Sequence, residues 1–251
     1  MSRRGVGRRR TAHGFSPRSL GNGLRLWLDA SVGVLPGNTF TWSDQSGYGN
    51  DATQSTAGLQ PTFNAASSNW NGRPCVTLDP ANSQYLKCDG IGALVASADA
   101  AVTICCVFRF AAMETLTRTF VNWGAGSIGL NSWYFGTDTL SQVMEARIED
   151  GAANTVTVLD DAPLDTNRHT SVTVAGGGLI SSFQDGVPLF LGQAFSVNAL
   201  ATTTCTLGNI REVAATRGMR GDFAEICILN RALSSSEINA LIAYERSKWG
   251  T

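Results

Sequence analysis

The sequence is poor in the residues that form catalytic and metal-binding centres. It has two histidines, His13 and His169, and no serine lies in a G-x-S-x-G turn. We therefore expect neither a nucleophilic triad nor a catalytic metal, and we predict that the protein is not an enzyme. No C-x-x-C pair occurs among the six cysteines, so their spacing does not indicate metal ligation; they are Cys75, Cys88, Cys105, Cys106, Cys205 and Cys227.

Long apolar segments are missing too. No run reaches the roughly 20 residues of a membrane-spanning helix. The basic N-terminus is followed by the polar residues 11–17 and not by the apolar stretch of a secretory signal. We therefore expect no membrane partner, and synthesis in a cytoplasm with reduced thiols that pack as small hydrophobic side chains. The alternative for two of these cysteines is a disulfide between Cys75 and Cys88.

Acidic residues are absent before Asp29, whereas six of the 19 basic residues lie in the first 18 positions. The rest of the chain carries 13 basic and 20 acidic residues, a net charge of −7. Arginine clusters bind phosphates, carboxylates and acidic protein surfaces through bidentate hydrogen bonds. We predict a partner-binding arm that prefers a protein to nucleic acid, with a solvated tail as the simplest alternative. Its binding residues would be Arg3, Arg4, Arg8, Arg9, Arg10 and Arg18.

From residue 24 onward the pattern changes to short apolar runs separated by Gly, Asn, Asp and Pro, which is typical of a β-sandwich or barrel. We predict an all-β, two-sheet antiparallel sandwich over residues 24–251, preceded by an extended basic arm over residues 1–23. The expected strands are 24–29, 75–79, 84–88, 102–110, 118–123, 132–136, 142–148, 154–158, 169–174, 179–184, 187–191, 204–208 and 222–229.

Residues 102–110 show the clearest strand pattern. Val102, Ile104, Cys106, Phe108 and Phe110 share one face, which we expect in the core. Residues 184–187 predict a tight hairpin, because a glycine at position 186 adopts a positive φ without strain.

One helix is expected, at the C-terminus. Ser234 and Glu237 match a capping box, and Leu233 and Ile238 match a hydrophobic staple. Ile238, Leu241 and Ile242 form an apolar stripe at helical spacing. We expect this helix to pack on the edge of the sandwich.

The candidates for glycosidase carboxylates are Glu145 and Glu149, with Arg147 between them. Residues four apart on a strand are about 13 Å apart, whereas glycosidase pairs need about 5–9.5 Å. The pattern therefore favours a surface ladder of ion pairs. We expect His169 to be an ordinary residue at a strand edge.

The loop at residues 42–51 is rich in oxygen donors, among them Asp44, Ser46 and Asn50. These oxygens could bind calcium, but satisfying the backbone of a tight loop is the interpretation that we favour. Aromatic residues could stack on sugars, although core positions are more common in a sandwich; the candidates are Trp70, Trp123, Trp133 and Tyr134. The tripeptide Arg220, Gly221, Asp222 lies at a strand start, and we interpret its integrin-like sequence as chance.

Several segments together resemble one family. They are residues 26–30, 42–52, 60–63, 71–74, 185–188, 221–234 and 248–250. In this order they resemble the laminin G-like, concanavalin A-like jelly-roll domains that are common in bacteriophage structural proteins and bacterial surface proteins.

The resemblance implies a jelly roll with one C-terminal helix, and a non-enzymatic structural protein of a phage virion, made in the host cytoplasm. A capsid decoration protein in many copies, attached to other capsid or virion subunits by its arm, is the function we predict first. The alternatives are a fibre or spike subunit, a carbohydrate-binding module for cell-surface glycans, and a capsid protein whose arm binds the genome.

Overall fold

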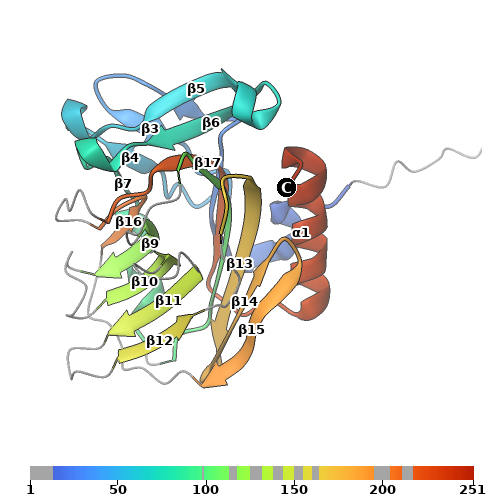
Figure 1. Cartoon of the computed structure of the whole chain (residues 1–251). Helices are drawn as coiled ribbons and strands as arrows, with labels where there is room; N and C mark the ends of the chain where they lie inside the picture. The colour runs from blue at the N-terminus through green and yellow to red at the C-terminus, as the bar shows by residue number, and fades with distance from the viewer. Residues whose placement is uncertain are drawn as a thin grey trace, which may run out of the picture.

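The computed structural model describes residues 14–97, 99–112, 118–124, 132–137, 144–149, 155–159, 164–194, 204–210 and 217–251. Two antiparallel sheets lie face to face, and one α-helix, α1 (Ser235–Trp249), lies outside them (Figure 1). The fold is the predicted jelly-roll sandwich with a C-terminal helix.

The first sheet has eight strands, with β8 and β17 near its centre. Its strands, in order from one edge, are β15 (Val187–Ala194), β14 (Leu179–Gln184), β13 (Arg168–Gly176), β8 (Val102–Phe110), β17 (Gly221–Leu229), β6 (Arg73–Leu78) and β5 (Thr62–Ser67). The first strand, β1 (Leu24–Asp29), pairs with the second half of β17, while β6 pairs with its first half. Through β17, the two ends of the domain are therefore hydrogen bonded to each other.

The second sheet has nine strands. In order they are β12 (Thr155–Leu159), β11 (Met144–Glu149), β10 (Ser132–Thr137), β9 (Arg118–Gly124), β16 (Cys205–Leu207), β7 (Leu86–Lys87), β4 (Ala52–Gln54), β3 (Phe40–Trp42) and β2 (Val34–Leu35). The connections also contain short 3₁₀ turns, namely η2 (Ala57–Leu59), η3 (Ser68–Trp70), η4 (Pro80–Asn82) and η5 (Asp89–Val95).

All thirteen predicted strands are present, each within three residues of its predicted ends. Four others were missed: β2, β3, β4 and β5. The first three have only two or three residues, too few to show an alternation. In β5 no side chain is buried, so the strand has no apolar face for the sequence to reveal.

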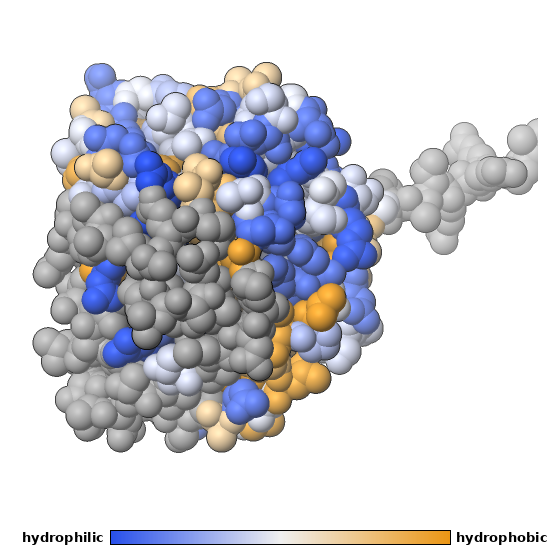
Figure 2. All heavy atoms as spheres, viewed as in Figure 1, coloured by the Kyte–Doolittle hydropathy of each residue, from blue (hydrophilic) through white to orange (hydrophobic). Residues whose placement is uncertain are grey.

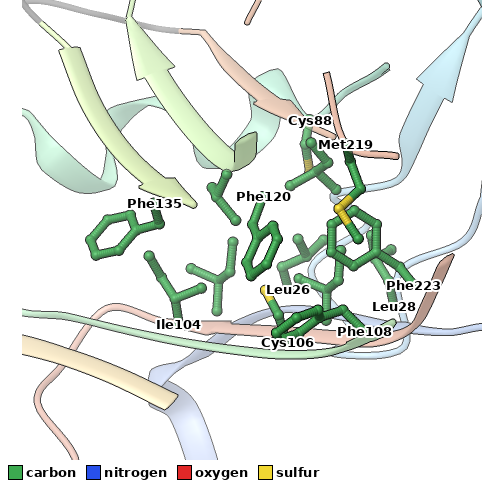
Figure 3. Packing of buried hydrophobic residues seen from close by; sticks show 14 of the residues in the cluster. Leu26, Leu28, Cys88, Ile104, Cys106, Phe108, Phe120, Phe135, Met219 and Phe223 are labelled. Carbon is green, nitrogen blue, oxygen red and sulfur yellow. The ribbon is translucent and has the colours of Figure 1, made fainter. Parts of the chain in front are cut away.

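The main core lies between the two sheets. The predicted inward face of β8 is confirmed, because Val102, Ile104, Cys106, Phe108 and Phe110 are all buried in it. Figure 3 shows Phe108 and Cys106 from the first sheet pointing towards Phe120 of β9 in the second. The rings of Phe108 and Phe120 are 4.5 Å apart, centroid to centroid.

Helix α1 begins and ends as its sequence predicts. The Ser234 and Glu237 side chains form the capping box, and Gly250 ends the helix with a φ of 72°. Its apolar side does not cover an edge of the sandwich, as we expected, but the outer face of the first sheet. There Ile238, Leu241 and Ile242 pack with residues from several strands in a second, smaller core, which includes Cys105, Val172, Cys227 and Leu229. A broad face offers more apolar area than an edge, which explains the correction. In the part of the chain that is described, no helix has the length and apolarity to cross a membrane.

Residues just before β1 pack against the body. The 3₁₀ segment η1 (Pro17–Gly23) buries Leu20 in the second core, and Phe15 packs beside it. Arg231 donates a hydrogen bond to the Leu20 carbonyl at 2.9 Å. The predicted division at residue 23 stays a prediction, but the packed structure begins several residues earlier.

All six cysteines are buried and free, so no disulfide joins Cys75 to Cys88. Burial raises the pKa of the Cys75 thiol to about 11 and raises the pKa of Cys88, Cys105, Cys106, Cys205 and Cys227 as well.

Candidate functional site

A surface pocket of about 270 Å³ opens beside the junction of the first and last strands. Its size is close to the lower end of the roughly 300–1,000 Å³ of small-ligand sites. The lining residues come from β1, the loop at 42–51, η5 and the residue after β17; they are Arg25, Tyr48, Asn50, Gly90, Ile91, Leu94 and Asn230.

The loop that carries Tyr48 is held by the Asp44 carboxylate. Oδ1 accepts hydrogen bonds from the backbone N–H groups of Trp27 and Ser46 at 2.9 and 2.8 Å. Oδ2 accepts from Ser46 Oγ at 2.6 Å and from the Asn50 N–H at 3.0 Å. The predicted backbone role is therefore confirmed. With four donors on one carboxylate, Asp44 is occupied by the loop itself and is a poor calcium ligand.

Tyr48 lies between two glycines with positive φ, Gly47 and Gly49, at the tip of this loop. Tyr48 is 49% exposed, and among the described large hydrophobic residues that are exposed it is the one aromatic residue. The Tyr48 hydroxyl donates to the Asn22 carbonyl at 3.3 Å. The Arg25 guanidinium carbon lies 4.4 Å from the ring centroid, which is cation–π geometry. The ring is thus fixed in place while half of its surface faces solvent.

Arg25 is held from its other side by Asn230. With the Asn230 amide oxygen turned towards it, the orientation that satisfies both residues, Nη2 and Nε of Arg25 donate at 3.0 and 3.1 Å. The Arg25 carbonyl accepts from Asn50 Nδ2 at 2.7 Å, so that backbone and side chain are both anchored. The planar guanidinium therefore has a defined orientation in the pocket.

The floor of the pocket depends on a close contact between Asn50 and Gly90. A Cβ atom at position 90 would collide with Asn50 Oδ1. Ile91 is buried under this contact and Leu94 is half-buried beside it. A glycine is therefore required at position 90 for Asn50 to lie across the floor.

The residues that the sequence suggested for stacking on sugars do not form a site. Trp70, Trp123, Trp133 and Tyr134 are each 0% exposed, so the core interpretation is confirmed. Asp222 of the integrin-like tripeptide is buried too, and it accepts hydrogen bonds from Thr77 Oγ1 and Trp70 Nε1 at 2.6 and 3.1 Å. It is therefore a structural residue.

The predicted carboxylates and histidine have different surroundings from those expected. Glu145 is buried on β11, which does not fit a ladder of surface ion pairs, and the side chain of Glu149 lies outside the described residues. His169 is also buried, with Nδ1 2.7 Å from Asp185 and Nε2 2.9 Å from Asp165. Burial alone would lower the pKa of His169, but the hydrogen bonds to Asp185 and Asp165 outweigh it and raise the pKa.

The structure describes one of the predicted arm residues, Arg18. Arg18 is exposed in η1, with its guanidinium carbon 6.0 Å from the Trp27 ring. The other five lie outside the described residues; they are Arg3, Arg4, Arg8, Arg9 and Arg10. The partner-binding role of the arm stays a prediction.

A cluster of charged side chains lies under α1, and no pattern in the sequence predicts it. Lys248 Nζ contacts Asp29 and Glu225 at 2.6 and 2.5 Å. Glu225 also accepts from the ring N–H of Trp249 at 2.7 Å. Nearby Glu245 is 0% exposed, and neither of its oxygens accepts a hydrogen bond.

A metal ion is a poor candidate for this cluster. Ligand atoms of Glu225, Cys227 and Glu245 lie within 4.8 Å of one another. Lys248 already supplies positive charge there, however, and burial raises the pKa of both Cys227 and Glu245. These groups therefore hold protons that a metal would have to displace.

Comparisons with known proteins identify the fold. No family model matches the sequence, and no curated protein is significantly similar to it. Domain 4 of AbnA, a GH43 extracellular arabinanase from Geobacillus stearothermophilus, solved in complex with arabinotriose, has a TM-score of 0.58 at 13% identity. The match covers 86% of this chain and 96% of that domain.

Two further solved structures are similar over 88% of this chain. The binding domain of Paraclostridial Mosquitocidal Protein 1 has a TM-score of 0.59 at 12% identity, and this chain covers 52% of it. Trypanosoma rangeli sialidase with the inhibitor DANA has a TM-score of 0.55 at 15% identity, and 33% of it is covered. At these identities the likeness shows a shared fold, the jelly-roll β-sandwich.

Proposed function

We propose that the protein is a non-catalytic carbohydrate-binding module and that its ligand occupies the pocket around Tyr48. The observation that carries the proposal is the fixed, half-exposed Tyr48 side chain at the rim of a pocket with both polar and apolar lining. A sugar ring has an apolar C–H face and a rim of hydroxyls. It therefore suits a site that combines one aromatic surface with a few oriented hydrogen-bonding groups.

The rest of the pocket fits such a ligand. Arg25 and Asn230 place guanidinium and amide groups on the lining, while Leu94 adds an apolar contact. The Arg25 and Tyr48 side chains are already held by contacts within the protein, so less conformational entropy is lost when a ligand binds. That a domain with the same fold was solved with arabinotriose supports the proposal by analogy.

A glycan array followed by calorimetric titration with the strongest binder tests the proposal. Replacing Tyr48 with Ala should weaken binding by roughly tenfold or more, as expected for a central aromatic contact. The matched control is Leu191→Ala, which removes a 58% exposed apolar side chain that does not line the pocket. Equal binding by both variants would place the glycan elsewhere, and failure of the wild type to bind any glycan would refute the proposal.

The basic arm favours a second function alongside the first. We propose that residues 1–13, with five arginines and no acidic residue, attach the protein to other subunits of a virion. The body carries the excess of acidic residues and would face outwards with its glycan pocket. Deletion of residues 1–13 leaves the packed η1 segment intact and should abolish incorporation into purified particles. Normal incorporation would refute the attachment role, and release by nuclease would favour the genome as the partner.

A further inference from the structure

We infer that the pocket is specific for a carboxylated sugar, and that Arg25 binds the carboxylate. The inference rests on the proposed function and narrows it to one class of ligand. Three observations support it, namely the unpaired charge of Arg25, the orientation of its free N–H groups, and the neutral lining around it.

The charge of Arg25 has no counter-ion in the described part of the protein. Three basic side chains do have one, whereas Arg73, Arg168 and Arg246, like Arg25, have none among the described residues. Arg231 contacts Glu237 at 2.6 Å, Arg109 contacts Asp222 at 3.8 Å, and Lys248 contacts two carboxylates. Within the described ranges, no carboxylate lies within 4.0 Å of the Arg25 guanidinium. A half-buried cation without a partner favours an anionic ligand.

The free N–H groups of Arg25 form a fork. A guanidinium has five N–H donors in one plane. Asn230 takes Nε and one donor of Nη2, and the Tyr48 ring centroid lies 4.4 Å from the guanidinium carbon. Nη1 and the second donor of Nη2 remain without a partner in the described structure. Two parallel donors of this kind match the two oxygens of a carboxylate.

The other lining residues are uncharged, so they would contact the sugar ring without repelling its carboxylate. Arg25 is the one charged side chain among the lining residues. Tyr48 and Leu94 offer apolar surface for a pyranose ring, and Asn230 offers an amide for its hydroxyls. A neutral sugar would leave the Arg25 fork unsatisfied, so the site should distinguish the acid from its neutral analogue.

The test compares matched pairs of ligands by NMR titration of the full chain. The probes are the methyl glycosides of glucuronic acid and of N-acetylneuraminic acid, each against its own methyl ester. Esterification removes the charge and changes the shape little. We expect at least one of the acids to bind about tenfold more tightly than its ester. Galactose 6-sulfate is the third probe, because a sulfate is an anion without the planar carboxylate.

Variants then connect the effect to Arg25. Arg25→Gln should abolish the preference for the acid, and Arg25→Lys should restore only part of it, since lysine lacks the fork. The matched control is Arg73→Gln, which removes an exposed arginine that lies 6.0 Å from the Trp249 ring, outside the pocket. It should bind the acid like the wild type. Amide spectra that match the wild type would show that each variant is folded.

The outcomes separate the two proposals. Equal binding of acid and ester, or a sulfated sugar that binds as tightly as the acids, would overturn the carboxylate inference and leave carbohydrate binding intact. Neutral glycans that bind through Tyr48 and are insensitive to Arg25→Gln would do the same. If neither these acids nor any glycan on the array shifts a pocket resonance, both proposals fail.

Discussion

Glu245 should make the folded protein less stable as the pH rises. Its side chain is fully buried in α1, beside the carboxylate of Glu225. The pKa of Glu245 is raised well above its usual value, chiefly by burial and next by the negative charge of Glu225. In the unfolded chain the same group titrates near a pKa of about 4.3. Between these two values the folded state holds a proton that the unfolded state has released.

The sign and size follow from proton linkage. Because the folded state binds more protons, the free energy of unfolding falls as the pH rises, by about 1.4 kcal/mol per pH unit for one proton. Glu245→Gln has the shape of the protonated acid and cannot titrate. The free energy of unfolding of the variant, relative to that of the wild type, should therefore rise with pH, by up to about 1.4 kcal/mol per pH unit, until the pH reaches the raised pKa of Glu245 in the folded state.

The assay is urea unfolding of both proteins at each pH unit from 5 to 8, followed by a plot of the difference in free energy. The control lies on the same helix. Glu237 has its pKa lowered to about 2, chiefly by its hydrogen bond with Arg231, so Glu237→Gln should be destabilising by an amount that stays constant from pH 5 to pH 8 and fades only below about pH 4. A difference between wild type and Glu245→Gln that stays constant with pH would refute a buried, protonated Glu245.

Further outcomes follow from other residues. Ser234→Ala should lower the free energy of unfolding by roughly 1 kcal/mol through loss of the helix cap, as measured by urea unfolding. The six thiols should not react with Ellman's reagent until the protein is unfolded, because burial keeps them protonated and out of reach. Asp185→Asn should lower the pKa of His169, measured by NMR, because one of the two carboxylates that raise it is lost. Gly90→Ala should weaken glycan binding in a titration while the melting temperature changes little, because Asn50 must leave the pocket floor.

Patterns within a short stretch of sequence predicted much of the fold. The alternation over residues 102–110 identified the face of β8 that lies in the core, and the spacing of Ser234 and Glu237 identified the start of α1. Both patterns depend on neighbours a few residues apart. The hairpin at residues 184–187 is a third example, with positive φ at both Asp185 and Gly186.

The candidate site depends on residues that are distant in the sequence. Arg25 and Asn230 meet because β1 pairs with β17, a register that no local pattern encodes. A signal was present at Tyr48, since an aromatic residue between two glycines in a polar loop is a poor core residue. For Glu245 the sequence was misleading, because a glutamate in an amphipathic helix ordinarily faces water.

The packing of residues 15–23 against α1 brings the start of the packed domain and its C-terminal helix to one side of the sandwich. Phe15 and Tyr244 lie 6.1 Å apart, ring centroid to ring centroid, and in Figure 1 the C-terminus also lies on the side of the molecule that α1 covers. Domains whose ends lie close together tolerate insertion into other proteins. The sandwich could therefore be spliced with short linkers into an exposed loop of a carrier protein.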